Sequence, residues 1–196
     1  MFDLQNLPAD IRAIIFDCDG TLVNTLPVYA EAWTQGFRTS GRDMMRDWYL
    51  GRAGHSEHAL MDLFEADQDV TLDREAVIKV MRKHFLQNVA SVGEVEAITA
   101  VARHNQGRLP MAVASGGSRQ IVTATLEATG LMPLFDTIVT INDVVRPKPE
   151  PDLFLEAARR LGIAAADCLV FEDSPEGMEA ADRAGMRCID ARPHRA

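Results

Sequence analysis

The amino-acid sequence predicts an α/β protein with a doubly wound parallel sheet as its core and a small α-helical cap inserted near its start. Short apolar runs without polar alternation are typical of strands that are covered on both faces, and amphipathic helical segments lie between the later runs. A long stretch after the first run has helical spacing of its aromatic residues and no convincing strand, which predicts the inserted cap.

Each element of the core follows from a local pattern. The apolar runs predict strands at residues 13–16, 111–114, 137–140 and 168–171, with a last strand at 187–190. Helices are expected over 119–129 and 152–161, each with one apolar face and a glycine directly after it. A third helix begins after Ser174, a good N-cap residue followed by proline, and ends near Gly185.

The stretch from residue 27 to residue 88 has a different pattern. Tyr29, Trp33 and Phe37 recur at helical spacing, and similar amphipathic segments follow. We therefore expect a helical cap over residues 26–88 and a Rossmann-like catalytic core built from residues 1–25 and 89–196. Because the cap adds no strand to the sheet, it is free to move relative to the core.

Composition and charge exclude several classes of protein. The 196 residues are 47% hydrophobic and carry a net charge of −9. Such a chain has enough apolar material for a core, and its acidic balance argues against binding nucleic acid or docking on an anionic membrane. No run approaches the roughly 20 apolar residues of a membrane span, and the N-terminus does not have the order of a signal peptide. The three cysteines read as free thiols, so we expect a cytoplasmic protein, and we expect it to be a monomer.

Two aspartates, Asp17 and Asp19, follow the first expected strand and precede Gly20 and Thr21. In a doubly wound sheet, ligands bind beyond the carboxyl ends of the strands, so both aspartates would lie at that edge. The same residues also suit an ordinary acidic turn. The motif alone leaves both interpretations open.

Two further segments offer groups that bind anions. Ser115 and Gly116 end the second expected strand before a helix, where backbone N–H groups and a hydroxyl favour a phosphate. Lys148 lies among three alternating prolines that fix the local backbone. The first segment could also be a plain glycine-rich turn with Ser118 as a helix cap, and the second a stiff linker with a solvated lysine.

A second pair of acids, Glu172 and Asp173, ends the fourth expected strand. Together with Asp17 and Asp19 they would converge at one sheet edge, where several ionised carboxylates repel one another unless protons or a cation are held there. A site with oxygen ligands and no histidine or cysteine suits Mg²⁺. Combined with Ser115 and a lysine, these acids are the groups that phosphoryl transfer needs.

The four segments, taken in order, resemble the four motifs of the haloacid dehalogenase-like (HAD) hydrolase superfamily, and the resemblance spans nearly the whole chain. The subgroup that the chain resembles most is the beta-phosphoglucomutase-like one, which includes sugar phosphatases acting on fructose 1-phosphate and 6-phosphogluconate. The matching residues are Asp17-x-Asp19-Gly20-Thr21-Leu22, Ser115-Gly116, Lys148-Pro149-x-Pro151-Asp152 and Glu172-Asp173-Ser174.

The resemblance implies a role for each motif residue. Asp17 would take the phosphoryl group as an aspartyl-phosphate, and Asp19 would act as the general acid and base. Ser115, Gly116 and Lys148 would bind the phosphoryl group. The substrate would be a small phosphorylated metabolite, and Mg²⁺ would be the cofactor. Its ligands would be Asp17, the backbone carbonyl of Asp19, Glu172 and Asp173.

Cap residues are expected to read the rest of the substrate. The glycine-flanked segment at residues 51–56 lies where relatives place a substrate-reading loop. Arg52 could bind a carboxylate or second phosphate there, and His55 or Ser56 could bind sugar hydroxyls. Thr25, at the start of the insertion, is a further candidate. An ordinary solvated turn is an equally good interpretation of the segment.

The chain departs from the family pattern in two places near the first motif. Asn24 stands where relatives commonly carry aspartate, and Tyr29 stands where mutases carry a cap-helix histidine. A phenol cannot replace the protonation switch of that histidine near neutral pH, so a phosphatase is favoured over a mutase. A phosphoacceptor signalling domain also uses strand-end aspartates, but it is smaller and lacks the helical insertion. A degenerate protein that only binds its ligand is disfavoured, because every motif position is filled.

Overall fold

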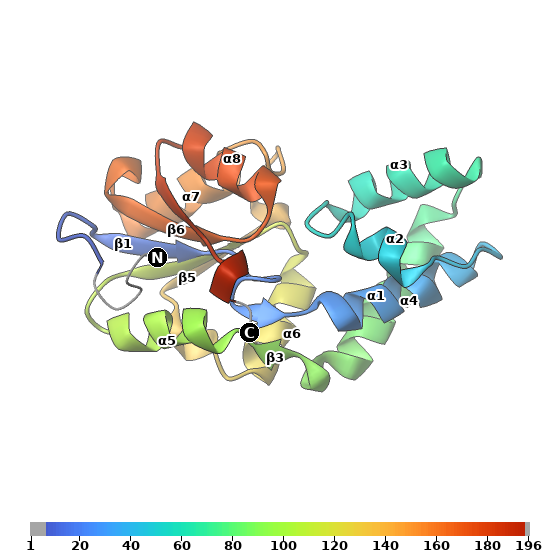
Figure 1. Cartoon of the computed structure of the whole chain (residues 1–196), viewed down its shortest axis with the longest axis horizontal. Coiled ribbons are helices and arrows are strands. Elements are labelled where there is room, and N and C mark those ends of the chain that lie inside the picture. The colour runs from blue at the N-terminus through green and yellow to red at the C-terminus, as the bar shows by residue number, and fades with distance from the viewer. Residues whose placement is uncertain (1–6, 195–196) are drawn as a thin grey trace.

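A parallel sheet forms the core, and helices cover both of its faces (Figure 1). The structure, a computed structural model, describes residues 7–194. Across the five-stranded sheet of this described part, the strand order is β5-β4-β1-β6-β7, so the first strand of the chain lies in the centre. The strands are β1 Ala13–Phe16, β4 Met111–Ser115, β5 Thr137–Thr140, β6 Cys168–Glu172 and β7 Arg187–Asp190. All their pairings are parallel, which confirms the predicted fold class.

The central strand β1 explains why the strand sequences are apolar throughout. Ile14 and Phe16 belong to one buried cluster, whereas Ala13 and Ile15 belong to a second cluster on the opposite face. Both faces are covered by helices, so neither set of side chains can be polar. The first cluster includes residues of α5 (Glu96–Asn105) and α6 (Arg119–Ala128), and the second includes residues of α7 (Asp152–Leu161) and α8 (Pro175–Arg183).

The predicted core helices are confirmed with their ends shifted by at most two residues. Two features of the structure were not predicted from the sequence: α5, and the antiparallel pair formed by β2 (Val23–Asn24) and β3 (Gly93–Glu94). β2 lies just before the first cap helix and β3 lies just after the last one, so their pairing holds together the two connections between core and cap. A strand of two residues has no periodicity that a sequence pattern could reveal.

Four helices form the cap at one end of the core (Figure 1). At their centre the rings of Phe37 and Phe64 stack with their centroids 3.9 Å apart, and the Trp48 ring meets both rings edge-on. In the part of the chain that the structure describes, every strand of the five-stranded sheet lies outside residues 26–88, which contain these helices. The cap helices are α1 Leu26–Arg38, α2 Arg46–Leu50, α3 Glu57–Gln68 and α4 Arg74–Asn88.

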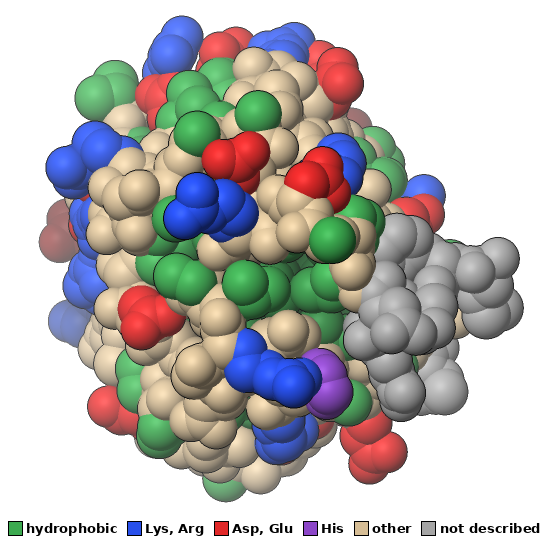
Figure 2. All heavy atoms as spheres, turned by 90° about the vertical axis from the view of Figure 1, so that its left-hand side faces the viewer, with side chains coloured by type: hydrophobic (Ala, Val, Ile, Leu, Met, Phe, Trp, Pro, Cys, Tyr) green, Lys and Arg blue, Asp and Glu red, His purple; other side chains and the backbone are tan. Residues whose placement is uncertain are grey.

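The end of the core opposite the cap carries acidic and basic side chains interspersed among apolar ones (Figure 2). This face therefore does not gather the single-sign charge that a nucleic-acid-binding surface needs. The three cysteines are free thiols, as expected, with Cys18 and Cys168 buried and Cys188 half-buried. Within residues 7–194, no helix has both the length and the apolar character to cross a membrane.

Close packing of α1 against α4 gives a first prediction. A Cβ at Gly36 would lie 2.9 Å from the Val77 carbonyl oxygen, so Gly36→Ala forces the two helices apart. We expect this substitution to lower the free energy of unfolding by about 1–3 kcal/mol in urea titrations. Gly51→Ala is the control, because its Cβ would meet the Asp47 carbonyl at an ordinary 3.6 Å. A Gly36→Ala protein as stable as the wild type would contradict the described helix packing.

Candidate active site

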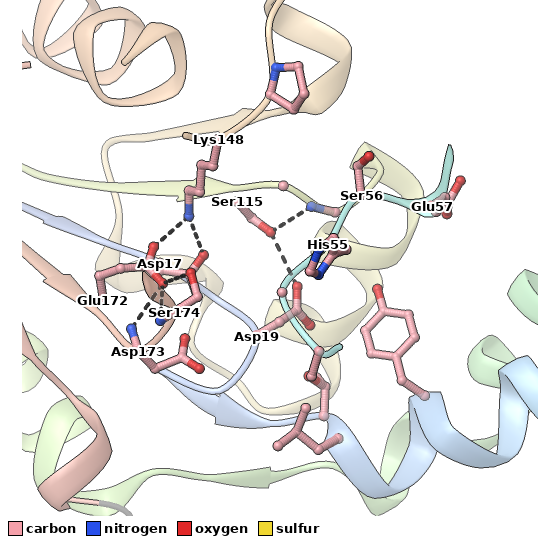
Figure 3. Close-up of a pocket in the computed structure, with 18 of the residues that line it drawn as sticks. Asp17, Asp19, His55, Ser56, Glu57, Ser115, Lys148, Glu172, Asp173 and Ser174 are labelled. Atoms are coloured by element: carbon pink, nitrogen blue, oxygen red, sulfur yellow. Dashed lines mark hydrogen bonds and ion pairs between the residues drawn. The ribbon is translucent and has the colours of Figure 1, made fainter. Parts of the chain in front are cut away.

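The carboxyl ends of three neighbouring strands meet at one edge of the sheet, and each carries a candidate residue (Figure 3). Asp17 follows β1, Ser115 ends β4 and Glu172 ends β6. The strand order β4-β1-β6 makes these residues neighbours although they are far apart in the sequence. The loop between β5 and α7 brings Lys148 to the same edge. The four motifs therefore converge as the sequence predicted.

The Lys148 ammonium lies at the centre of this group. Its Nζ is 2.7 Å from Asp17 Oδ1 and 2.7 Å from Glu172 Oε2, and it donates a third bond of 3.2 Å to the Ala114 carbonyl oxygen. The lysine side chain is only 7% exposed. Burial alone would lower the pKa of Lys148, but the two carboxylates raise it above its ordinary value. The lysine therefore stays charged and is held by three acceptors.

The carboxylates are not fully neutralised by this one lysine. Burial raises the pKa of Asp17 above its usual range, and the negative charge of Glu172 raises it further, while Lys148 opposes both effects. Asp173 adds a third carboxylate beside the pair. One ammonium among three carboxylates leaves the group negative, so a bound cation would stabilise it.

The residues present fit a divalent metal ion. Carboxylate oxygens of Asp17, Glu172 and Asp173 lie within 4.8 Å of one another. The Thr21 hydroxyl donates a 3.1 Å hydrogen bond to Asp173 Oδ1 and helps to fix that side chain. Oxygen donors of this kind suit a hard cation such as Mg²⁺, so the cluster could bind one. The Asp19 side chain is not part of the cluster, and its proposed contact with a metal would come from the backbone carbonyl.

Glu172 is held more firmly than its position at a strand end suggests. Its Oε1 accepts hydrogen bonds from the Asp173 N–H, the Ser174 N–H and the Ser174 hydroxyl, all at 2.8–2.9 Å. Ser174 in turn caps α8 by accepting from the Gly177 N–H. The sequence predicted only a chemical role for this glutamate. The structure shows that it joins the start of α8 to the lysine at the centre of the site.

The segment that contains Ser115 and Gly116 lies beside Asp19. The Ser115 hydroxyl donates a 3.2 Å bond to Asp19 Oδ2 and accepts a 3.0 Å bond from the Gly117 N–H. Burial raises the pKa of Asp19, and the neighbouring Thr25 and Ser115 hydroxyls partly oppose this rise. Asp19 Oδ1 and the Thr25 hydroxyl are both buried. A pocket lies between the core and the cap, and Asp19, Thr25, Ser115 and Gly116 all line it. Their polar atoms are therefore placed to meet a ligand.

The cap closes the other side of the pocket. The turn before α3 approaches the core closely, because a Cβ at Gly54 would lie 3.2 Å from the Ser174 Cβ. His55 and Ser56 line the pocket, as expected, together with Asp19 and Ser115 of the core (Figure 3). The His55 Nδ1 lies 2.9 Å from the Arg52 carbonyl oxygen, which can only accept, so Nδ1 carries the proton. Nε2 is then able to accept a hydrogen bond from a substrate hydroxyl.

Arg52 is oriented away from this pocket. Its guanidinium lies 4.4 Å from the centre of the Trp48 ring and pairs with Asp67 at 3.0 Å. The Trp48 ring N–H donates to the same Asp67 carboxylate at 2.7 Å. Arg52 is not among the described residues that line the pocket. In this arrangement it anchors the turn that carries His55, and direct contact with substrate stays a prediction.

Four residues of the cap line the pocket although their positions in the sequence did not predict it: Leu26, Trp33, Tyr49 and Glu57. A signal existed for Trp33, because it lies one helical turn after Tyr29, which also lines the pocket. Glu57 directly follows Ser56, whose hydroxyl accepts from the Ala59 N–H as the N-cap of α3. No local pattern indicates that Tyr49 faces the pocket.

A family model for haloacid dehalogenase-like hydrolases matches residues 11–185. The chain belongs to the haloacid dehalogenase-like hydrolase family. This membership confirms the resemblance inferred from the four motifs, and it confirms the expectation of a hydrolytic enzyme.

Individual relatives of this HAD-like hydrolase cover almost all of it. The chain is 33% identical to the fructose-1-phosphate phosphatase YqaB of Escherichia coli, over 91% of this chain and 95% of YqaB. It is 30% identical to hexitol phosphatase A of the same organism, over 91% of this chain and 82% of the relative. The crystal structure of CbbY from Rhodobacter sphaeroides in complex with phosphate has a TM-score of 0.82 and 26% identity, covering 92% of this chain and 85% of CbbY.

The contact between α8 and Glu172 gives a second prediction. A Cβ at Gly177 would overlap Glu172 Cδ and Oε2, so Gly177→Ala must displace the glutamate or the helix. We expect a loss of about 1–3 kcal/mol in the free energy of unfolding, measured by urea titration. Gly93→Ala, where no atom lies within 4 Å of the added Cβ, should leave stability nearly unchanged. Equal stability of the two variants would contradict the placement of Glu172.

Proposed function

We propose that this HAD-like hydrolase is a Mg²⁺-dependent phosphatase that hydrolyses a small sugar or sugar-acid monophosphate through an aspartyl-phosphate at Asp17. The observation that carries the proposal is the buried Lys148, which bridges Asp17 and Glu172 beside Asp173. Relatives named as a fructose-1-phosphate phosphatase and a hexitol phosphatase support a phosphorylated sugar or polyol as substrate.

In the first proposed step, an Asp17 carboxylate oxygen attacks phosphorus and the bond from phosphorus to the sugar oxygen breaks. Lys148 lies against Asp17 and reduces the repulsion between this carboxylate and the incoming phosphate. The Ser115 hydroxyl and the Gly116 N–H would hold the phosphoryl oxygens. Asp19 gives its proton to the sugar oxygen as it leaves, and burial supports this role because it raises the pKa of Asp19.

In the second step, water attacks the phosphorus of the aspartyl-phosphate. Asp19, now ionised, takes a proton from that water, so the acid of the first step becomes the base of the second. Inorganic phosphate leaves and the Asp17 carboxylate is restored. Asp17, the Asp19 backbone carbonyl, Glu172 and Asp173 would hold Mg²⁺, which when bound supplies positive charge that offsets the carboxylates and the phosphate.

A mutase is the second candidate function, because the same aspartyl-phosphate would begin both reactions. Tyr29 stands at the cap position where mutases carry a histidine, and its ring packs 4.4 Å from the Phe85 ring while lining the pocket. Burial raises the pKa of Tyr29 well above its ordinary value, so the phenol stays neutral and cannot act as a protonation switch. This observation favours release of phosphate over its return to a sugar.

The proposed mechanism predicts that Asp17→Asn abolishes phosphate release, because a carboxamide does not attack phosphorus. The measurement is phosphate release from a panel of sugar phosphates with Mg²⁺, for the wild type and the variant. Asp47→Asn is the matched control, since Asp47 lies in the first turn of α2 and does not line the pocket. We expect at least about a thousandfold loss for Asp17→Asn and wild-type rates for the control.

Three results of this experiment would count against the proposal. Near-wild-type activity of Asp17→Asn would show that Asp17 is not the nucleophile. Full activity in excess chelator would show that the reaction does not need a metal ion. Interconversion of hexose phosphates much faster than phosphate release would replace the phosphatase with a mutase.

A further inference from the structure

The turn between α2 and α3 (residues 51–56) brings the cap against the core. A Cβ added at Gly54 would lie 3.2 Å from the Ser174 Cβ, so the backbone of the turn itself makes this approach. His55 follows directly and lines the pocket. The hydrogen bond from the His55 N–H to the Arg52 carbonyl, which crosses the turn, is long at 3.4 Å. The backbone alone therefore holds the turn weakly.

The side chain of Arg52 ties the turn to two cap helices. Its guanidinium donates a 3.1 Å hydrogen bond to the Trp48 carbonyl of α2 and a 3.0 Å bond to Asp67 Oδ2 of α3. It also lies over the Trp48 ring, 4.4 Å from the ring centre. The Trp48 ring N–H donates to the same Asp67 oxygen at 2.7 Å. One carboxylate oxygen of α3 therefore holds a side chain of α2 and a side chain of the turn.

Trp48 is fixed in turn by the aromatic centre of the cap. Its ring meets the Phe37 and Phe64 rings edge-on, with centroids 6.4 and 5.3 Å away. The side chains of Arg52 and Asp67 are 32% and 41% exposed, so their ion pair adds little to stability. What the shared hydrogen bonds do determine is the orientation of the turn relative to the helices.

This orientation decides where the Arg52 carbonyl oxygen points. It lies 2.9 Å from His55 Nδ1, which must carry the proton because a carbonyl oxygen can only accept. The hydrogen bond at one ring nitrogen of a histidine sets the tautomer and therefore the state of the other nitrogen. With the carbonyl in place, Nε2 of His55 is held as an acceptor. Without it, a neutral imidazole is free to exchange between its two tautomers.

We propose that Asp67 and Arg52 are positioning residues, which act on a bound substrate through His55 and do not touch it. They would hold the turn so that His55 Nε2 stays an acceptor for a hydroxyl of the leaving group. This role rests on the proposed phosphatase function. It adds a determinant of substrate binding that lies outside the pocket, because neither Asp67 nor Arg52 is among the described residues that line it.

Kinetics of Asp67→Ala test the role in catalysis. For fructose 1-phosphate we expect KM to rise by about tenfold, since one hydrogen bond to the leaving group is lost, while kcat changes by less than about twofold. For p-nitrophenyl phosphate, whose leaving group has no further hydroxyl, we expect KM to change by less than about twofold. Equal effects on the two substrates, or none on either, would overturn the inference.

Two further variants serve as control and rescue. Asp43→Ala breaks a comparable cap pair, in which Asp43 accepts from Arg38 at 2.8 Å, and neither residue lines the pocket. It should leave both KM values unchanged. Asp67→Asn keeps an oxygen that can accept from both donors, so it should recover most of the wild-type KM. Circular dichroism and urea titration check that every variant folds with nearly wild-type stability.

A double-mutant cycle asks whether the effect passes through His55. In a His55→Ala protein, adding Asp67→Ala should change KM by less than about twofold, because the residue it acts on is gone. Arg52→Ala should match Asp67→Ala and should not add to it. A full further loss in the His55→Ala protein would overturn the inference. So would a rise in KM for Arg52→Ala alone, which is the result expected if Arg52 bound the substrate directly.

The tautomer of His55 gives a readout that does not depend on activity. Nitrogen-15 chemical shifts of the imidazole are recorded at about pH 9, where histidine is ordinarily neutral, and are assigned by comparison with His55→Gln. We expect a proton on Nδ1 in the wild type and in Asp43→Ala, and a mixture of both tautomers in Asp67→Ala. A proton on Nε2 in the wild type, or the same tautomer in Asp67→Ala, would overturn the inference.

Failure of this role and failure of the phosphatase function give different results. Hydrolysis of fructose 1-phosphate with the same KM in the wild type and Asp67→Ala would overturn only the positioning role. No hydrolysis of any phosphate ester by the wild type would overturn the proposed function, and the positioning role with it. If Asp67→Ala does not fold, Arg52→Ala takes its place in the kinetics, the cycle and the nitrogen-15 measurement.

Discussion

Two carboxylates, Asp17 and Glu172, are buried at the carboxyl edge of the sheet and share the ammonium of Lys148 at 2.7 Å each. Removing one partner of such a buried pair typically costs about 3–5 kcal/mol, because the remaining charge is left without compensation. The strands and loops around the site must therefore keep Asp17, Glu172 and Lys148 together. Residues 131 positions apart in the sequence must be brought together, and the β4-β1-β6 order does so by placing the first strand between strands from the second half of the chain.

The same constraint connects the fold to chemistry. One lysine only partly neutralises this group of carboxylates, which favours binding of a divalent cation. The positive charges of the cation and the lysine would together offset the repulsion between the carboxylates and a phosphate. The start of α8 fixes Glu172 through three hydrogen bonds, and Gly177 leaves the space that this glutamate needs. Residues of the cap line the other side of the same pocket, so the core would set the reaction and the cap would set the substrate.

Much of the core could be predicted from the sequence, because its determinants are local. Apolar runs mark the strands, and each motif residue directly follows or ends a strand, so parallel strands bring Asp17, Ser115 and Glu172 to one edge. The cap was less predictable, because its side chains are oriented by contacts between helices. Arg52 turns to Trp48 and Asp67, and Glu57 turns its carboxylate to Arg82 on another helix, 25 residues later. Spacing along one helix contains no information about such a partner.

A rapid-quench measurement of the phosphorylation state of Asp17 tests directly whether this carboxylate is the nucleophile and whether it needs a metal ion. The enzyme is mixed with fructose 1-phosphate, with Mg²⁺ or with excess chelator, and quenched in acid before one turnover is complete. Borohydride then converts any aspartyl-phosphate to homoserine, which mass spectrometry of the peptide spanning Asp17 detects. We expect homoserine at position 17 that rises and decays with phosphate release when Mg²⁺ is present, and none with chelator. Phosphate release at the full rate with no modification of Asp17 at any time would contradict it.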